Sequence, residues 1–364
     1  MKLIAVAGAR PNFMKIAPLV RELTNNKHDI QCSLVHTGQH YDYDMSKVFF
    51  NELGIPEPDY FLNVGSGSHA AQTAKVMTEF ETVCLRDRPD IVVVVGDVNS
   101  TLACSITAKK LTISVAHVEA GLRSGDMSMP EEINRIVTDS ISDLLFVTED
   151  SGIKNLKDEG KPDRQVFFVG NIMIDTLHYS LAKLNHDSRG HAVKGDYAVV
   201  TLHRPSNVDH KEKLSGILDA LVEISKDMPV YFPIHPRTEK NIERFKLKDK
   251  LDGSRIEMRS PMSYFDFLAL WKDATLVLTD SGGLQEETTA LGVPCFTLRD
   301  NTERPITVEE GSNTLVGTTR QGILDTYRAF KEGSRRDWKV PELWDGKTAQ
   351  RIVSILNRSA PRNT

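Results

Sequence analysis

Short apolar runs alternate with amphipathic stretches along the whole chain. Residues 91–95 form the clearest run, Ile-Val-Val-Val-Val, as expected for a strand buried on both faces of a sheet. Similar runs begin at Tyr197 and cover residues 3–7, 30–37, 113–117, 144–148, 166–170, 229–234, 276–278 and 293–298. Helical sequence lies between them, and a terminal helix is expected at about 348–356. This alternation predicts an α/β protein with parallel sheets.

The alternation is interrupted once, between residues 184 and 195. That stretch is polar, contains glycine and has no apolar periodicity, so it reads as a crossing between two domains. A length of 364 residues is also consistent with about two domains. The sequence therefore predicts a first domain over 1–184 and a second domain that begins at 185.

Composition removes several functional classes. The net charge of −5 gives no basic footprint for nucleic acid. The apolar runs are too short to span a bilayer, and the N-terminus has no cleavage-site pattern. The four cysteines lack CxxC spacing, which argues against a zinc site or a disulfide framework. We expect a cytoplasmic protein without membrane or nucleic-acid partners.

The first candidate site follows the apolar run 276–278. Ser281, Gly282 and Gly283 stand where that strand would pass into a helix, and helix starts of this kind attract phosphate. Glu287 lies about one helical turn after Gly283, where a carboxylate could hold a ribose diol. An ordinary serine-capped helix explains the same residues equally well.

Three carboxylates follow separate strand or loop ends in the first half: Asp97, Glu119 and Glu131. Asp97 could simply cap the next helix, and Glu131 follows Pro130 in a common helix opening. Carboxyl ends of parallel strands meet at one edge of a sheet, where open α/β proteins bind ligands. Together the three carboxylates therefore predict a site.

Like the three carboxylates, several cations and histidines follow the ends of predicted strands. Arg10 and Lys15 follow the first strand in a loop that lacks GxGxxG, so a nicotinamide cofactor is poorly supported. His203 and His235 each follow a strand of the second half, where both a functional and a structural role fit a histidine. Phe267 is expected in the core, although an aromatic side chain there could also cover a base.

Taken together, these residues carry a resemblance to the non-hydrolysing UDP-N-acetylglucosamine 2-epimerases. The matching motifs are Gly8-Ala9-Arg10-Pro11 with Lys15, Thr37-Gly38-Gln39-His40, Gly96-Asp97-Val98-Asn99-Ser100-Thr101, His117-Val118-Glu119-Ala120-Gly121-Leu122-Arg123, Pro130-Glu131-Glu132-Ile133-Asn134-Arg135, His203-Arg204, Asp280 to Glu287 and Thr302-Glu303-Arg304-Pro305. The resemblance implies two Rossmann-like domains facing a cleft, as in GT-B glycosyltransferases. It implies a UDP-binding domain over 185–346 and a C-terminal helix, 347–364, that returns to the first domain. It also implies a homodimer that needs neither metal nor nicotinamide.

The resemblance further implies roles for individual residues. Asp97, Glu119 and Glu131 would move protons at C2 of the sugar, and His203 would assist the departing UDP. The substrate-binding set would be Arg10, Lys15, His235, Met262, Phe267, Ser281, Gly282, Gly283, Glu287 and Arg304. The reaction would eliminate UDP in the anti sense to give a 2-acetamidoglucal, then add UDP back. The C2 proton is not next to a carbonyl, so its direct removal would give no stabilised carbanion.

Some positions depart from the family pattern. Pro205 stands where many bacterial members have a second arginine, and Ala71 stands at another expected arginine. Asp42 lies in a Tyr-Asp-Tyr-Asp loop where regulated members carry basic and amide residues, and Ile306 replaces a common glutamate. The first three departures argue against activation by substrate. The open alternatives are the same chemistry on another UDP-sugar such as UDP-2,3-diacetamido-glucuronate, a hydrolysing epimerase, a GT-B glycosyltransferase and a non-catalytic nucleotide-sugar sensor.

Overall fold

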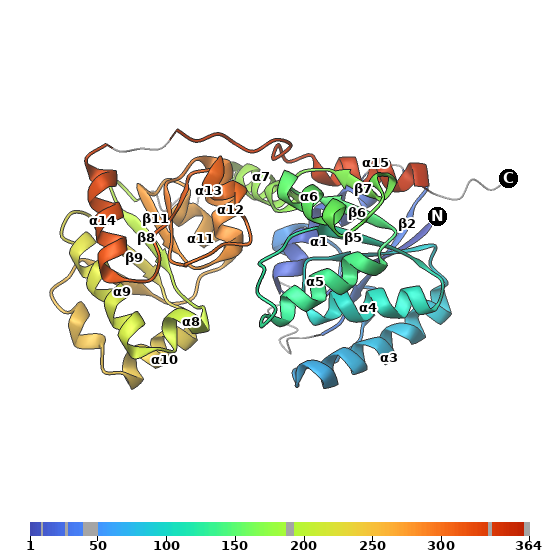
Figure 1. The fold of residues 1–364 in the computed structure, drawn as a ribbon, viewed down its shortest axis with the longest axis horizontal. Helices are drawn as coiled ribbons and strands as arrows, with labels where there is room; N and C mark the ends of the chain where they lie inside the picture. Colours follow the sequence, from blue (N-terminus) through green and yellow to red (C-terminus); the bar gives the residue numbers. More distant parts are fainter. Residues whose placement is uncertain (9, 26–27, 39–49, 187–192, 334–336, 360–364) are drawn as a thin grey trace. The chain divides into compact units, whose positions relative to one another are not determined.

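The computed structural model describes all residues except 9, 26–27, 39–49, 187–192, 334–336 and 360–364. The chain divides into two compact units (Figure 1). Unit 1 comprises Met1–Tyr179 and Glu342–Thr364, and unit 2 comprises Ser180–Pro341. The sequence placed the boundaries at 184/185 and 346/347. In the structure the units divide between Tyr179 and Ser180, inside the continuous helix α7 (Ile172–His186). A polar composition alone does not reveal a boundary within a helix.

Unit 1 is built on a seven-stranded sheet with strand order β3-β2-β1-β4-β5-β6-β7, and every recorded pairing is parallel. Its strands are β1 (Lys2–Ala7), β2 (Gln31–His36), β3 (Tyr60–Phe61), β4 (Ile91–Val95), β5 (Ser114–Ala120), β6 (Leu144–Val147) and β7 (Val166–Phe168). Its helical segments are α1 (Arg10–Asn25), α3 (His69–Asp87), α4 (Asn99–Lys110), α5 (Pro130–Ile141), α6 (Asp150–Asp158), the 3₁₀ turn η1 (Asp163–Gln165), α15 (Thr348–Ser359) and most of α7 (Ile172–His186).

Unit 2 repeats the arrangement on a six-stranded sheet with order β10-β9-β8-β11-β12-β13, again parallel in every recorded pairing. Its strands are β8 (Ala198–Thr201), β9 (Val230–Pro233), β10 (Ile256–Arg259), β11 (Leu276–Thr279), β12 (Cys295–Thr297) and β13 (Asn313–Leu315). Its helical segments are α8 (Pro205–Val208), α9 (Lys211–Ile224), α10 (Pro236–Arg244), the 3₁₀ turn η2 (Lys248–Leu251), α11 (Tyr264–Trp271), α12 (Gly282–Leu291), α13 (Ile306–Glu309) and α14 (Arg320–Lys331).

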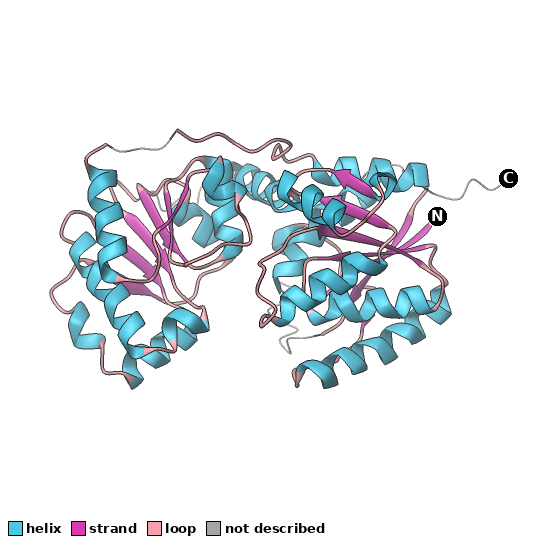
Figure 2. Ribbon diagram, viewed as in Figure 1, coloured by secondary structure: helices cyan, strands magenta, loops and turns pink. Residues whose placement is uncertain are grey.

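Both sheets have the doubly wound order of the Rossmann fold, which confirms the predicted fold class. Figure 2 shows the strands of each unit between helices on either side. The direction of winding reverses between β1 and β4 in unit 1 and between β8 and β11 in unit 2. Ligands of such sheets bind beyond the carboxyl ends of the strands at this reversal.

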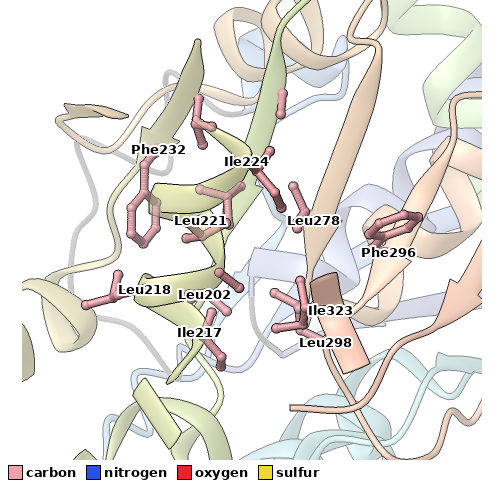
Figure 3. Packing of buried hydrophobic residues seen from close by; sticks show 14 of the residues in the cluster. Leu202, Ile217, Leu218, Leu221, Ile224, Phe232, Leu278, Phe296, Leu298 and Ile323 are labelled. Atoms are coloured by element: carbon pink, nitrogen blue, oxygen red, sulfur yellow. The ribbon is translucent and has the colours of Figure 1, made fainter. Parts of the chain in front are cut away.

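The core of unit 2 explains why its strands read as unbroken apolar runs. Helices α9 and α14 lie against strands β8, β9 and β11, and their apolar side chains interdigitate around Leu221 and Leu278 (Figure 3). Unit 1 has an equivalent core in which Val92 and Val94 of β4 meet Phe80 of α3. Each fully buried aliphatic side chain contributes roughly 1.5–3 kcal/mol. These cores hold the strand ends, and thus the loops after them, in fixed positions.

The C-terminal helix α15 packs against α1 in unit 1. Asp175 of α7 accepts the N–H groups of Thr348 at 3.0 Å and Ala349 at 2.7 Å, which satisfies the first turn of α15. The indole of the buried Trp344 donates to the carbonyl of Thr148. A carboxylate from a different helix therefore anchors the end of the chain.

No helix among the described residues is both long and apolar enough to cross a membrane.

Candidate functional site

Unit 1 brings Lys15 of α1 and Glu119 of β5 into an ion pair at the carboxyl end of its sheet. Glu119 is buried and has a φ of 71°, a value that non-glycine residues rarely adopt. It is the extra residue of a β-bulge, because Val118 pairs with Phe146 while Ala120 pairs with Val147. The predicted strand ended at His117, so the extension of β5 through Ala120 corrects that boundary. The bulge turns the Glu119 carboxylate toward Lys15.

Asp97 follows β4 and forms an ion pair with Arg135 of α5. The cap of α4 is Val98, so the interpretation of Asp97 as a helix cap was wrong. Asn134 donates to the Asp97 carbonyl at 2.8 Å. Arg135 is itself held by Glu132, at 2.6 Å, so the cation beside Asp97 is fixed in place. The sequence motif contained Arg135 but gave no sign that it would contact Asp97.

The remaining residues predicted in unit 1 are less constrained. Glu131 lies in the first turn of α5 and is half-buried, and no ion pair of its side chain is found within the described part of the chain. Arg10 begins α1, but its side chain lies outside the described residues, as does Asp42. The structure therefore groups Asp97, Glu119 and Lys15 around Gly96: a Cβ placed on Gly96 would lie 3.3 Å from Lys15 Nζ and 3.5 Å from Glu119 Oε2.

In unit 2, the turn from β11 into α12 leaves its anion-binding groups available. Ser281 is the N-cap residue of α12, but within the described chain its hydroxyl accepts no N–H of that helix. The backbone N–H of Ser281 donates instead to Thr279 Oγ1 at 2.9 Å. Gly282 and Gly283 open the helix without side chains, so a ligand can approach the backbone closely. The interpretation of an ordinary serine cap is therefore excluded by the geometry.

His203 lies beside this turn because Asp280 holds it there. Asp280 is fully buried and accepts His203 Nδ1 at 2.9 Å and the backbone N–H of Arg204 at 2.9 Å. Burial alone would raise the pKa of Asp280, but the hydrogen bonds from His203 and the backbone outweigh it and lower the pKa. With Nδ1 engaged, His203 has Nε2 left to face a ligand.

His235 caps α10 and its ring centre lies 5.9 Å from that of His203. Burial, together with the neighbouring His203 and Arg237, lowers the pKa of His235. The two predicted histidines are thus brought together at the ends of β8 and β9.

Glu287 is buried on α12 and accepts a hydrogen bond of 2.5 Å from the hydroxyl of Tyr264. Burial, reinforced by the charge of Glu286, raises the pKa of Glu287 to about 7. Met262 precedes α11 and Phe267 lies on it, both half-buried. The sequence did not indicate Tyr264 as a partner of Glu287.

Arg304 is buried and pairs with Glu286 at 2.6 Å. The neighbouring Glu303 pairs with Arg299 at 2.6 Å and with Arg204 at 3.1 Å. Burial alone would raise the pKa of Glu303, but Arg299 and the other arginines lower it to about 2. A Cβ on Gly282 would lie 3.0 Å from Glu303 Oε1, so this network borders the α12 turn. Sequence reasoning assigned no role to Arg204, Arg299 or Glu303, although the motifs contained Arg204 and Glu303.

Three departures from the family pattern lie in described residues. Ala71 is exposed in the first turn of α3, Pro205 begins α8 and Ile306 begins α13. All three occupy helix starts, where their backbone geometry is ordinary.

Known proteins resemble this chain over nearly its whole length. The sequence model of the UDP-N-acetylglucosamine 2-epimerase family matches residues 21–357. The chain is 46% identical to UDP-N-acetylglucosamine 2-epimerase of Methanocaldococcus jannaschii, over 98% of this chain and 99% of the relative. It is 42% identical to UDP-2,3-diacetamido-2,3-dideoxy-D-glucuronate 2-epimerase of Pseudomonas aeruginosa, over 90% and 92% of the two chains. A crystal structure of the M. jannaschii protein in complex with UDP-GlcNAc and UDP superimposes with a TM-score of 0.89 at 45% identity, covering 98% of this chain and 100% of the other.

Proposed function

Because the chain belongs to the UDP-N-acetylglucosamine 2-epimerase family, we propose that it interconverts UDP-N-acetylglucosamine and UDP-N-acetylmannosamine. The observation that carries the proposal is the pairing of two strand-end carboxylates, Asp97 and Glu119, with Arg135 and Lys15. Glu119 is buried and Asp97 is half-buried, and a unit that only bound a nucleotide would not need two carboxylates held by cations in this way. Acids held at fixed positions suit proton transfer at carbon.

Unit 2 would hold UDP. The N-terminus of α12, with Ser281, Gly282 and Gly283, would take the diphosphate. Glu287 would accept hydrogen bonds from the ribose hydroxyls, and Phe267 with the backbone near Met262 would contact uracil. The resemblance adds Arg10, His235 and Arg304 to the diphosphate contacts.

The reaction would proceed in two matched steps. The C1–O bond breaks and its electron pair leaves with UDP, while one carboxylate takes the C2 proton and C1=C2 forms. UDP oxygen then adds back to C1 of the 2-acetamidoglucal as a proton is delivered to the opposite face of C2. His203, oriented by Asp280, would protonate or neutralise the departing phosphate, and Asp97, Glu119 and Glu131 would move the protons.

Incubation with UDP-N-acetylglucosamine in D₂O tests the proposal. Deuterium should enter C2 and UDP-N-acetylmannosamine should accumulate. Folded protein that gives neither result would disprove the function, and free N-acetylmannosamine with UDP would identify a hydrolysing enzyme instead. Asp97→Asn, Glu119→Gln and Glu131→Gln should each lower turnover about 10²-fold or more while UDP affinity stays near wild type. Loss of UDP binding would assign those residues to nucleotide positioning.

A second candidate substrate is UDP-2,3-diacetamido-2,3-dideoxy-D-glucuronate, because the P. aeruginosa relative named for it matches nearly the whole chain. The two UDP-sugars differ in their groups at C3 and C6. The chemistry at C1 and C2 would be the same for both. A panel of both UDP-sugars, compared by kcat/KM, decides between them. We favour UDP-N-acetylglucosamine on the name of the 46% identical relative.

The proposal includes a homodimer in the cytoplasm, as the resemblance implies. Leu85 of α3 and Ile133 of α5 are exposed apolar side chains of unit 1 that a second copy could cover. Light scattering of the purified protein measures the oligomeric mass, and a monomeric mass at micromolar concentration would exclude a stable dimer.

A further inference from the structure

A fully buried histidine–aspartate pair lies behind the carboxylates of unit 1. His117 of β5 places Nδ1 2.6 Å from Asp139 Oδ1 and Nε2 2.9 Å from the carbonyl oxygen of Gly96. Both side chains have no exposed surface, so neither can touch a substrate directly. His117 belongs to the motif that contains Glu119, yet the proposed chemistry gives it no role.

Both ring nitrogens of His117 face acceptors: Nδ1 faces the carboxylate of Asp139, and Nε2 faces the carbonyl oxygen of Gly96. Asp139 also accepts Arg123 Nη1 at 2.8 Å. Burial alone would raise the pKa of Asp139, but His117 and Arg123 lower it, so this carboxyl is ionised. The pair is therefore a charge-assisted connection inside the sheet.

The pair forms hydrogen bonds with the backbone at the ends of two neighbouring strands, β4 and β5. The Gly96 carbonyl held by His117 belongs to the peptide bond that leads into Asp97. Asp139 Oδ2 accepts the N–H of Gly121 at 2.9 Å, just beyond Glu119. One buried pair thus connects the ends of β4 and β5, which carry two of the candidate acids.

This backbone needs such support because its conformation is unfavourable. Glu119 has a φ of 71° within the bulge, a left-handed conformation that is unfavourable for a non-glycine residue. Gly96 and Gly121 have φ values of 68° and 81°. Strained conformations persist only where the surroundings over-determine them. Bonds to Gly96 and Gly121 supply that constraint from within the protein.

We propose that His117 and Asp139 are positioning residues that set Asp97 and Glu119 for proton transfer at C2. This inference rests on the proposed function. Without the pair, the strand ends relax, the acids move relative to C2 and the proton-transfer step slows. A displacement of about 1 Å at a reacting group can cost on the order of 10²-fold in rate.

The experiment compares Asp139→Asn with Asp143→Asn. Asp143 is a matched control because it also accepts a backbone N–H of β5, from Val115 at 2.8 Å, and pairs with a cation, Lys109, at 2.8 Å. It holds the opposite end of the strand. Each variant is assayed for kcat, KM, UDP affinity and the isotope effect on kcat with substrate deuterated at C2.

Asp139→Asn should lower kcat about 10- to 100-fold, leave UDP affinity within about twofold of wild type and raise the isotope effect, because proton transfer becomes more rate-limiting. Asp143→Asn should leave the isotope effect unchanged. A variant that only lowers the fraction of folded enzyme would reduce kcat without altering the isotope effect, and that result for Asp139→Asn would overturn the inference. An unchanged kcat would overturn it as well.

His117→Asn provides a second route if Asp139→Asn does not fold. Asparagine keeps a donor near the position of Nδ1 for Asp139 but loses the bond to Gly96, so the isotope effect should again rise. No rise in soluble His117→Asn would contradict the positioning role. Wild-type enzyme that fails to exchange the C2 hydrogen would instead disprove the proposed function, so the two failures are distinguishable.

Discussion

Replacement of Glu287 by glutamine should make the protein more stable and weaken its binding of UDP. Glu287 is buried, and its one described side-chain hydrogen bond comes from Tyr264. Its pKa is raised from 4.5 to about 7. At about 1.4 kcal/mol per pKa unit, ionised Glu287 costs the folded state on the order of 3 kcal/mol. Glutamine removes that cost and can still accept the tyrosine hydroxyl.

The direction in which stability changes with pH follows from proton binding by Glu287. Between about pH 4.5 and pH 7 the folded protein keeps a proton on Glu287 that the unfolded chain releases, so stability falls as the pH rises through this range. The gain from Glu287→Gln should therefore be largest at pH 8, up to about 3 kcal/mol, and should disappear near pH 4.5. Denaturant titrations of wild type and variant across this pH range measure the difference in the free energy of unfolding. The signal should follow the unfolding transition of unit 2.

The adjacent Glu286 provides a control of opposite sign. Glu286 pairs with the buried Arg304, so Glu286→Gln removes one counter-charge of a buried cation and should destabilise the folded protein by about 3 kcal/mol. Glu287→Gln should weaken UDP binding about tenfold, because a charged acceptor for the ribose is lost. A Glu287→Gln variant that is no more stable than wild type at pH 8, or whose gain does not vary with pH, would refute the reasoning.

Other substitutions test the site separately. Ser281→Ala should weaken UDP binding yet change stability by less than about 0.5 kcal/mol, because the hydroxyl caps no described helical N–H; calorimetric titration and thermal melting measure the two effects. Gly121→Ala should destabilise by more than about 2 kcal/mol, because a Cβ would lie 2.4 Å from the Gly152 carbonyl, whereas Gly125→Ala, with a similar φ but open space, should cost about 1 kcal/mol in the same denaturant titration. Asp280→Asn should lower kcat about 10²-fold by disorienting His203, which steady-state kinetics would detect; an unaffected kcat would remove His203 from the mechanism.

The sequence by itself determined the fold class and the order of the chemistry along the chain. A short apolar run such as 91–95, bounded by Pro89 and Gly96, indicates a buried strand, and parallel strands place their following loops at one edge. For this reason Asp97, His203 and Ser281 could be selected from position alone. The helix start after β11 was likewise readable, because a serine and two glycines after an apolar run indicate a strand-to-helix junction, although the sequence left open whether the turn binds an anion or only caps the helix.

Tertiary structure alone decided which groups meet. Lys15 and Glu119 are 104 residues apart, and the partners His203 and Asp280 are 77 apart. No local pattern encodes such pairs, because they depend on the register and twist of the sheet. The bulge at Glu119 and the burial of Glu287 against Tyr264 are of the same kind. Local sequence sets backbone preference, whereas charge pairing and desolvation depend on distances that exist only after the elements have packed.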